Sequence, residues 1–135
     1  MNANHPIIRG AEPAEAHVIT ELVLRSKAYW GYSDEFMQYA AAVLTITPAY
    51  ITQHPSYVLL QDGQLLGFAS LKELTPDEVE LDLLFVAPTA IGQGVGKRLT
   101  EYMIGVAAAA GYRTLFIESD PNAAGFYEKM GGQLI

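Results

Sequence analysis

The sequence contains no cysteine and no long apolar run. The absence of cysteine excludes disulfides, thiolate metal sites and a cysteine nucleophile, and it fits a reducing compartment. No apolar run approaches the roughly 20 residues that cross a bilayer, and residues 1–10 lack the basic and apolar regions of a signal peptide. We therefore expect a soluble, unprocessed, cytoplasmic protein with no membrane partner.

Positive charge is also scarce, because 15 acidic residues face only eight basic ones and give a net charge of −7. Such a charge repels polyphosphate backbones and argues against nucleic acid as a partner. The three histidines, His5, His17 and His54, show none of the spacings of a metal site. We read them as surface residues and expect no bound metal.

The remaining composition is that of a globular domain. Half of the 135 residues are hydrophobic and only 17% are charged, which argues against disorder. The length is typical of a single core. With no repeat or linker visible, we predict one domain over residues 1–135.

The first half of the chain predicts a strand, two helices and a hairpin. Residues 6–9 suggest a short strand, Pro13 begins a helix that extends to Lys27, and Ser33 caps a second helix through Val43. The loop between the helices carries the large rings of Trp30 and Tyr32. The Asp-Gly pair at 62–63 then predicts a hairpin of strands 56–61 and 64–72.

The second half predicts a strand, a helix, a buried strand and a further helix. Residues 78–86 alternate acidic and apolar side chains up to Leu83 and then become wholly apolar. A helical face from Val95 leads to Gly111, and residues 112–118 suggest a buried strand. Residues 122–130 suggest a short helix. The whole order predicts an α+β fold, whose mixed central sheet is flanked by helices and gains a parallel crossover.

A glycine-rich turn at residues 92–98, Gly-Gln-Gly-Val-Gly-Lys-Arg, joins the acidic strand to this helix. Glycines let backbone N–H groups approach an anion, and the helix dipole favours its negative charge. Lys97 and Arg98 oppose that dipole by about 0.3–1 kcal/mol each unless an anion offsets them. Ile91 and Arg98 exclude a Walker A loop and Lys97 excludes a Rossmann fingerprint, which leaves a phosphate cradle or a plain turn with solvated cations.

Two motifs resemble a known family. Leu-Phe-Val-Ala-Pro at 84–88, followed by the glycines of 92–96, resembles motif A of the GNAT acetyltransferases, and residues 122–131 resemble their motif B. The resemblance covers about residues 78–132 and implies the GNAT acyl-CoA N-acyltransferase fold with acetyl-CoA or coenzyme A as co-substrate. It implies cofactor binding by Leu84, Phe85, Val86, Gly92, Gln93, Gly94, Val95, Gly96, Lys97, Arg98, Asn122 and Tyr127.

The sequence departs from the family pattern in three places. Ile91 stands where the family has Gln or Arg near the pyrophosphate, so a lower affinity for phosphate is expected. Gly132 stands where a Phe is usual, which removes a packing ring. The C-terminal strand is missing or shortened, which leaves a sheet edge to be covered either by a second copy in a homodimer or by residues beyond a shortened end.

Amine acetylation needs a base, a donor to the thioester oxygen and an acid for the thiolate. Glu80 and Asp82 are candidate bases, although a solvated strand face explains either one equally well. Tyr127 lies where the family places its thiolate-protonating tyrosine, with core packing as the alternative. Trp30 and Tyr32 are candidates for binding the acceptor, although loop aromatics that cap a core are equally common, and Glu118 is a further candidate.

The sequence therefore predicts an N-acetyltransferase that moves an acetyl group from acetyl-CoA to a primary amine by direct attack in a ternary complex. The acidic residues predict a cationic acceptor, either a small molecule or a lysine side chain. The alternatives are a non-catalytic acyl-CoA sensor or a regulatory or interaction domain on the same fold.

Overall fold

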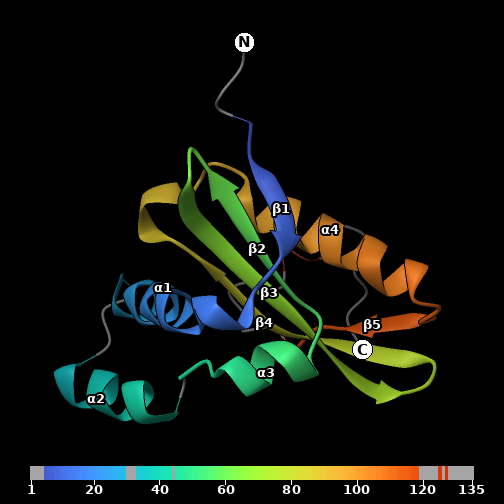
Figure 1. Cartoon of the computed structure of the whole chain (residues 1–135), viewed down its shortest axis with the longest axis horizontal. Helices are drawn as coiled ribbons and strands as arrows, with labels where there is room; N and C mark the ends of the chain where they lie inside the picture. The colour runs from blue at the N-terminus through green and yellow to red at the C-terminus, as the bar shows by residue number, and fades with distance from the viewer. Residues whose placement is uncertain (1–4, 30–32, 44, 119–124, 126, 128–135) are drawn as a thin grey trace.

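The computed structural model describes residues 5–29, 33–43, 45–118, 125 and 127. Five strands, four α-helices and two short 3₁₀ helices (η) follow one another along this part of the chain (Figure 1). In chain order they are β1 (Ile7–Gly10), η1 (Pro13–Glu15), α1 (Ala16–Tyr29), α2 (Asp34–Val43), α3 (Pro48–Gln53), β2 (Ser56–Gln61), β3 (Gln64–Thr75), β4 (Glu78–Val86), η2 (Pro88–Ala90), α4 (Val95–Ala109) and β5 (Thr114–Phe116).

The strands form one mixed sheet in the order β1-β2-β3-β4-β5. The first three pairings are antiparallel, and β4 pairs with β5 in parallel after the crossover through α4. Asp62 and Gly63 both have positive φ, at 53° and 78°, as the two central residues of the tight hairpin turn require. The predicted hairpin, parallel crossover and α+β class are confirmed.

Helices cover both faces of the sheet (Figure 1). Phe68 and Phe85 pair across β3 and β4, and the ammonium of Lys27 in α1 lies 5.7 Å from the centre of the Phe85 ring. Gly67 faces the opposite side of the sheet from its neighbour Phe68, and there it lies against α4. Seven of the largest fully buried side chains fill the space between these layers: Phe68, Ile19, Leu22, Leu59, Leu71, Leu99 and Met103.

Gly67 sets the position of α4 on the sheet. A Cβ at residue 67 would lie 2.5 Å from Leu99 Cδ1 and 2.9 Å from Val95 Cγ1, both closer than packed carbon atoms approach. The missing side chain therefore lets the first two turns of α4 sit directly on β3. This contact holds the preceding glycine turn beside the end of β4.

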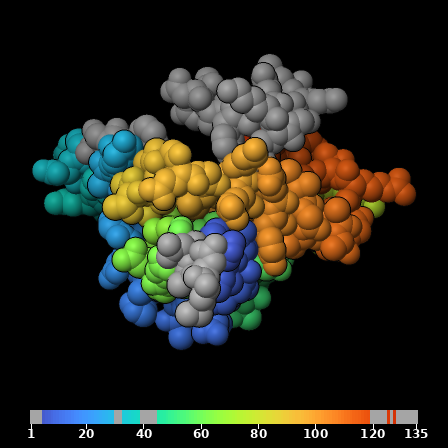
Figure 2. All heavy atoms as spheres, turned by 90° about the horizontal axis from the view of Figure 1, so that it is seen from above, coloured from blue at the N-terminus to red at the C-terminus, as the bar shows by residue number. Residues whose placement is uncertain are grey.

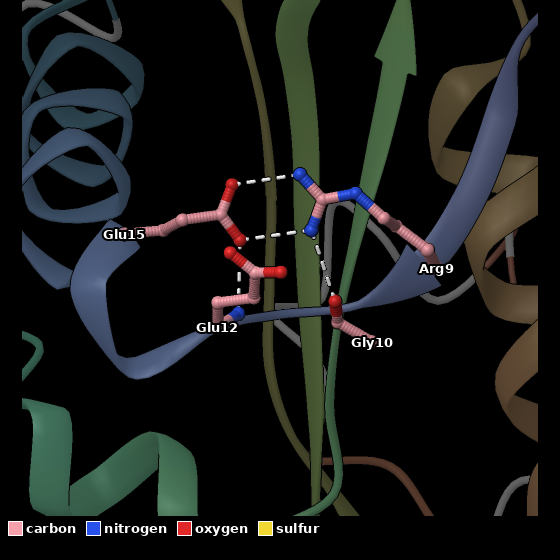
Figure 3. A network of polar contacts seen from close by, with 4 residues as sticks. All are labelled: Arg9, Gly10, Glu12 and Glu15. Carbon is pink, nitrogen blue, oxygen red and sulfur yellow. Dashed lines mark hydrogen bonds and ion pairs between the residues drawn. The ribbon is translucent and has the colours of Figure 1, made fainter.

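An ion pair joins β1 to the start of the first helical segment (Figure 3). Arg9 donates to both carboxylate oxygens of Glu15, at 2.9 and 2.8 Å, and Glu15 also accepts from the backbone N–H of Glu12 at 2.9 Å. The Arg9 hydrogen bonds hold the pKa of Glu15 below its ordinary value. Such a bidentate pair fixes direction as well as distance, so it orients the segment from Pro13 onward.

Several details differ from the sequence prediction. The helix expected from Pro13 begins as η1 and continues as α1 to Tyr29, and α3 was not predicted at all. The last predicted strand is short and only partly buried, because β5 pairs only with Glu78–Glu80 of β4. The predicted helix at 122–130 and the C-terminal strand fall mostly or wholly outside the described residues.

The predicted alternation along β4 is also wrong beyond Leu81. Leu81 pairs with Leu71 and Leu83 pairs with Ser70, so Asp82 is an extra residue in a bulge. The bulge moves Leu83 to the face opposite Val79 and Leu81. Because a bulged strand bends and twists locally, the bulge also explains why β4 and β5 stop pairing just before it.

Candidate active site

The glycine turn, residues 92–98, begins as an open loop, and α4 starts within it at Val95. Gly92 and Gly94 have φ of 85° and 81°, a region that L-residues other than glycine rarely adopt. A Cβ at either position would meet no atom within 4 Å. Figure 2 shows this segment, in gold ahead of the orange helix, on the surface of the molecule.

Gly94 is the N-cap of α4 and offers no side-chain hydrogen bond to it. The first helix bond runs from Arg98 N–H to Gly94 O at 3.0 Å, so the amides of residues 95–97 have no acceptor within the helix. These donors, the positive end of the helix dipole and the open space above the turn all suit a phosphate. The geometry fits the predicted pyrophosphate cradle.

Two cations stand beside these amides. Lys97 and Arg98 are exposed, the first turn of α4 contains no acidic residue, and no carboxylate in the described part of the chain pairs with either side chain. Nothing in that region therefore offsets their unfavourable interaction with the helix dipole. An anionic ligand would do so.

The second half of β4 has an open edge. Only Glu78–Glu80 pair with β5, whereas β4 continues to Val86. Leu84, Phe85 and Val86 are all half-buried, and they end two residues before η2, which leads into the glycine turn. The backbone of residues 81–86 is therefore free of β5 among the described strands, beside the anion cradle.

Glu80 and Asp82 lie on the face of the sheet that α1 and α3 cover. Both are half-buried, and both act electrostatically on the phenol of Tyr50 in α3. They are therefore close to one another in space, as their spacing along the strand predicts. Burying a carboxylate costs free energy unless it is paired. The half-burial of both side chains therefore argues against the alternative that they only form a solvated strand face.

Tyr50 and Ser70 belong to this cluster and were not predicted. The Tyr50 hydroxyl donates a short hydrogen bond to Asp82 Oδ2 and lies 2.7 Å from Ser70 Oγ. Burial and the bond to Asp82 raise the pKa of Tyr50 well above its ordinary value. No local motif marks either residue, because Tyr50 lies in an unpredicted six-residue helix and Ser70 lies within a strand.

Tyr127 packs against the hydrophobic core and is half-buried. Desolvation by burial raises its pKa above the ordinary value. A phenol with a raised pKa keeps its proton at neutral pH. The phenol is therefore protonated at that pH.

The structure does not bring all of the predicted residues together. Glu118 is described and exposed, two residues beyond β5. Trp30, Tyr32 and Asn122 lie outside the described residues. Their predicted roles in acceptor and cofactor binding stay predictions.

A hollow of about 500 Å³ in the described part of the chain lies elsewhere. It is lined by α1, the β2–β3 turn and the start of η2, and it touches neither the glycine turn nor Glu80 and Asp82. The described residues include no cluster of three side chains suited to holding a metal. No helix among them is long and apolar enough to span a membrane.

Comparison with known proteins places these features in a family. The sequence profile described as the acetyltransferase (GNAT) family matches residues 19–132. The peptidyl-lysine N-acetyltransferase YiaC of Escherichia coli (strain K12) is 35% identical over 98 residues, which are 72% of this chain and 64% of that protein. The chain thus spans less than two thirds of this relative.

Solved structures agree with the sequence match. A GCN5-related N-acetyltransferase from Rhodopseudomonas palustris is 28% identical, with a TM-score of 0.73 over 96% of this chain and 82% of that one. A GNAT family acetyltransferase from Brucella melitensis, solved in complex with acetyl-CoA, has a TM-score of 0.75 over 97% and 84% at 23% identity, which shows the shared fold. The family match covers most of the sequence, and the chain belongs to the acetyltransferase (GNAT) family.

Proposed function

We propose that this chain transfers an acetyl group from acetyl-CoA to a primary amine by direct attack in a ternary complex. The observation that carries the proposal is the placement of an anion cradle beside an unpaired strand edge. The cradle is the glycine turn with its free amides and two cations. The edge is residues 81–86 of β4, which β5 does not pair.

Acetyl-CoA fits this arrangement at two points. Its pyrophosphate would lie on the amides of the turn beside Lys97 and Arg98, and its pantetheine arm would run along residues 84–86. The thioester supplies the acyl group. The fold relative from Brucella melitensis, which was solved with acetyl-CoA, supports this choice of co-substrate.

The residues around the strand supply the remaining chemistry. A carboxylate takes the proton of the ammonium, and the freed nitrogen forms a bond to the acetyl carbon while the carbon–sulfur bond breaks. The N–H groups among residues 84–86 that face the open edge rather than β3 donate to the carbonyl oxygen. Tyr127 gives its proton to the departing thiolate, and the second proton of the nitrogen, which is lost as the amide forms, restores the proton of Tyr127 through solvent. We assign the base to Glu80, with Asp82 as its substitute or relay partner.

The acceptor is proposed to be a cationic amine, either a lysine side chain or a small molecule. Half-buried carboxylates at Glu80 and Asp82 favour a positive group. The relative YiaC is a peptidyl-lysine N-acetyltransferase, which supports a peptide lysine as the first substrate to try.

A non-catalytic acyl-CoA sensor is the second candidate. Ile91 is the observation that favours it: the side chain is 39% exposed at the start of the turn, where the family pattern has a Gln or Arg. A sensor would bind acetyl-CoA without releasing thiol in the presence of any amine.

The direct test follows free thiol release from acetyl-CoA with lysine peptides, polyamines and aminoglycoside-like amines. We expect turnover with at least one of them and a fall in kcat/KM for Glu80→Gln of about 10²–10⁴-fold, the range for a positioned base. Glu78→Gln is the matched control, because Glu78 lies on the same strand and accepts from Thr75. Binding of acetyl-CoA with no turnover of any amine would instead support the sensor.

A cytoplasmic location and a homodimer belong to the same proposal. The outer edge of β5 has no partner strand among the described residues, and open edges pair readily with other chains. A second copy would cover that edge. Sedimentation of an active monomer would contradict the dimer.

A further inference from the structure

The hydroxyl groups of Tyr50 and Ser70 form a chain that ends on Asp82. Ser70 Oγ lies 2.7 Å from the Tyr50 hydroxyl, and that hydroxyl donates to Asp82 Oδ2. The three residues come from three different elements: α3, β3 and β4. Ser70 is fully buried, so water does not compete for its hydroxyl.

The direction of this chain follows from the chemistry of its ends. An ionised carboxylate only accepts hydrogen bonds, so Tyr50 donates to Asp82. The Tyr50 oxygen is then left to accept the proton of Ser70. Because the pKa of Tyr50 is raised by burial and by Asp82, this hydroxyl keeps its proton and its hydrogen bond to Asp82 at neutral pH.

The second oxygen of Asp82 points elsewhere. Oδ1 has no hydrogen-bond partner among the described residues, and no buried side-chain oxygen or nitrogen in that part of the chain lacks one. Since Asp82 is half-buried, its Oδ1 must reach the surface. Oδ2 of Asp82 is thus fixed by the Tyr50 hydroxyl, whereas Oδ1 can accept a hydrogen bond from a ligand.

Helix α3 is built around Tyr50. Thr47 caps the helix by accepting from the Tyr50 N–H at 3.0 Å. The His54 ring stacks on the Tyr50 ring, with 4.2 Å between the ring centres, and its Nδ1 lies 3.1 Å from the Tyr50 carbonyl oxygen. Backbone and ring are therefore fixed independently of the hydroxyl.

The bulge in β4 completes the arrangement from the other side. Asp82 is the extra residue opposite Ser70 and Leu71, and bulges commonly redirect a side chain next to a functional site. The bulge directs Asp82 toward Tyr50 and Ser70. It also lies where β4 separates from β5, at the edge proposed to hold acetyl-CoA.

We propose that Tyr50 is a positioning residue which, together with Ser70, fixes Asp82 so that its open oxygen accepts a hydrogen bond from the ammonium of the acceptor. The inference rests on the proposed transfer to an amine and assigns the two carboxylates different tasks. Asp82 binds and orients the ammonium. Glu80, close to the same phenol, removes the proton.

The test is a double-mutant cycle on the full chain, with the amine found active in the thiol-release screen. Tyr50→Phe should raise the KM for the amine about tenfold, in line with losing a hydrogen bond to a charged group, while the acetyl-CoA-induced rise in Tm stays the same. In the Asp82→Asn background the same change should have less than a twofold effect, because Tyr50 acts through Asp82. Tyr57→Phe is the control, since Tyr57 contacts Tyr102 instead.

Two other results would overturn the proposal. Multiplicative effects of Tyr50→Phe and Asp82→Asn on KM would show that Tyr50 does not act through the carboxylate, and a lower Tm with an unchanged KM would reduce Tyr50 to a packing residue. If Tyr50→Phe does not fold, Ser70→Ala should still raise the KM about threefold, and an unchanged KM there would count against the chain. A wild-type protein that turns over no amine would overturn the proposed function itself. That outcome differs from failure of the Tyr50 proposal, in which the wild type is active.

Discussion

The glycine turn and the Tyr50–Asp82 cluster, the two regions proposed to bind a charged group, are built in opposite ways. The turn uses backbone amides from consecutive residues, is exposed, and carries its cations without partners among the described residues. The cluster uses side chains 20 and 32 residues apart, and Ser70 within it is fully buried. A site built from consecutive backbone amides is encoded by a local sequence motif. A site built from distant side chains forms only when the tertiary fold brings them together.

The largest expected effect separates Tyr127, the proposed acid, from Tyr50, the positioning residue of the cluster. Tyr127→Phe removes the proposed acid and should lower kcat by about 10²–10⁴-fold with little change in acetyl-CoA affinity. Tyr50→Phe removes the same atom from a positioning residue and should act mainly on the KM for the amine. Steady-state kinetics with each variant, measured where chemistry limits the rate, would show the contrast.

Tyr112→Phe provides the control for that comparison, because Tyr112 donates to Glu73 on the surface and takes no part in the site. A fall in kcat of less than about threefold for Tyr127→Phe would make Tyr127 a packing residue and return the acid role to water.

The next effect concerns the turn alone. Gly94→Asp places a negative charge in the proposed cradle and should abolish the stabilisation by acetyl-CoA, which is about 2.7 kcal/mol at a hundredfold excess over Kd. Gly111→Asp is closely matched, because Gly111 follows the other end of α4 with a φ of 94° and nothing within 4 Å of its Cβ position. Thermal denaturation should show a lower Tm than wild type for both variants. Acetyl-CoA should raise the Tm of Gly111→Asp but not that of Gly94→Asp.

The parts of the fold that were predicted are those whose signals are local. The Asp62-Gly63 turn, the Ser33 cap of α2 and the glycine that ends α4 each depend on a few adjacent residues. The glycine turn was found for the same reason. Its role in cofactor binding is a further step, which the binding measurements above would test.

The parts that were missed depend on distant contacts. Asp82 becomes an extra residue only because of how β4 pairs with β3, and that register is not visible in β4 itself. Helix α3 is six residues long, too short to be stable without packing, and β5 is limited by where its partner bends. The candidate bases were therefore identified from strand alternation, while Tyr50 and Ser70, which hold one of them, were not.

The smallest expected effect is a dependence of stability on alkaline pH that comes from buried tyrosines, Tyr50 of the cluster among them, and not from the turn. Burial raises the pKa of Tyr50 and of Tyr127 in the folded chain, whereas in the unfolded chain each phenol ionises near pH 10. Above that pH the unfolded state loses protons that the folded state keeps, so the contribution to stability is present below about pH 10 and is lost as pH rises further. Each tyrosine can lower the free energy of unfolding by at most about 1.4 kcal/mol per pH unit in this range.

Urea denaturation between about pH 9 and pH 11 should therefore show a shallower fall in the free energy of unfolding for Tyr50→Phe than for the wild type. Gly111→Asp, which destabilises without adding a group that titrates there, should keep the wild-type slope, and the same slope in Tyr50→Phe would mean that this phenol is not held protonated by its surroundings.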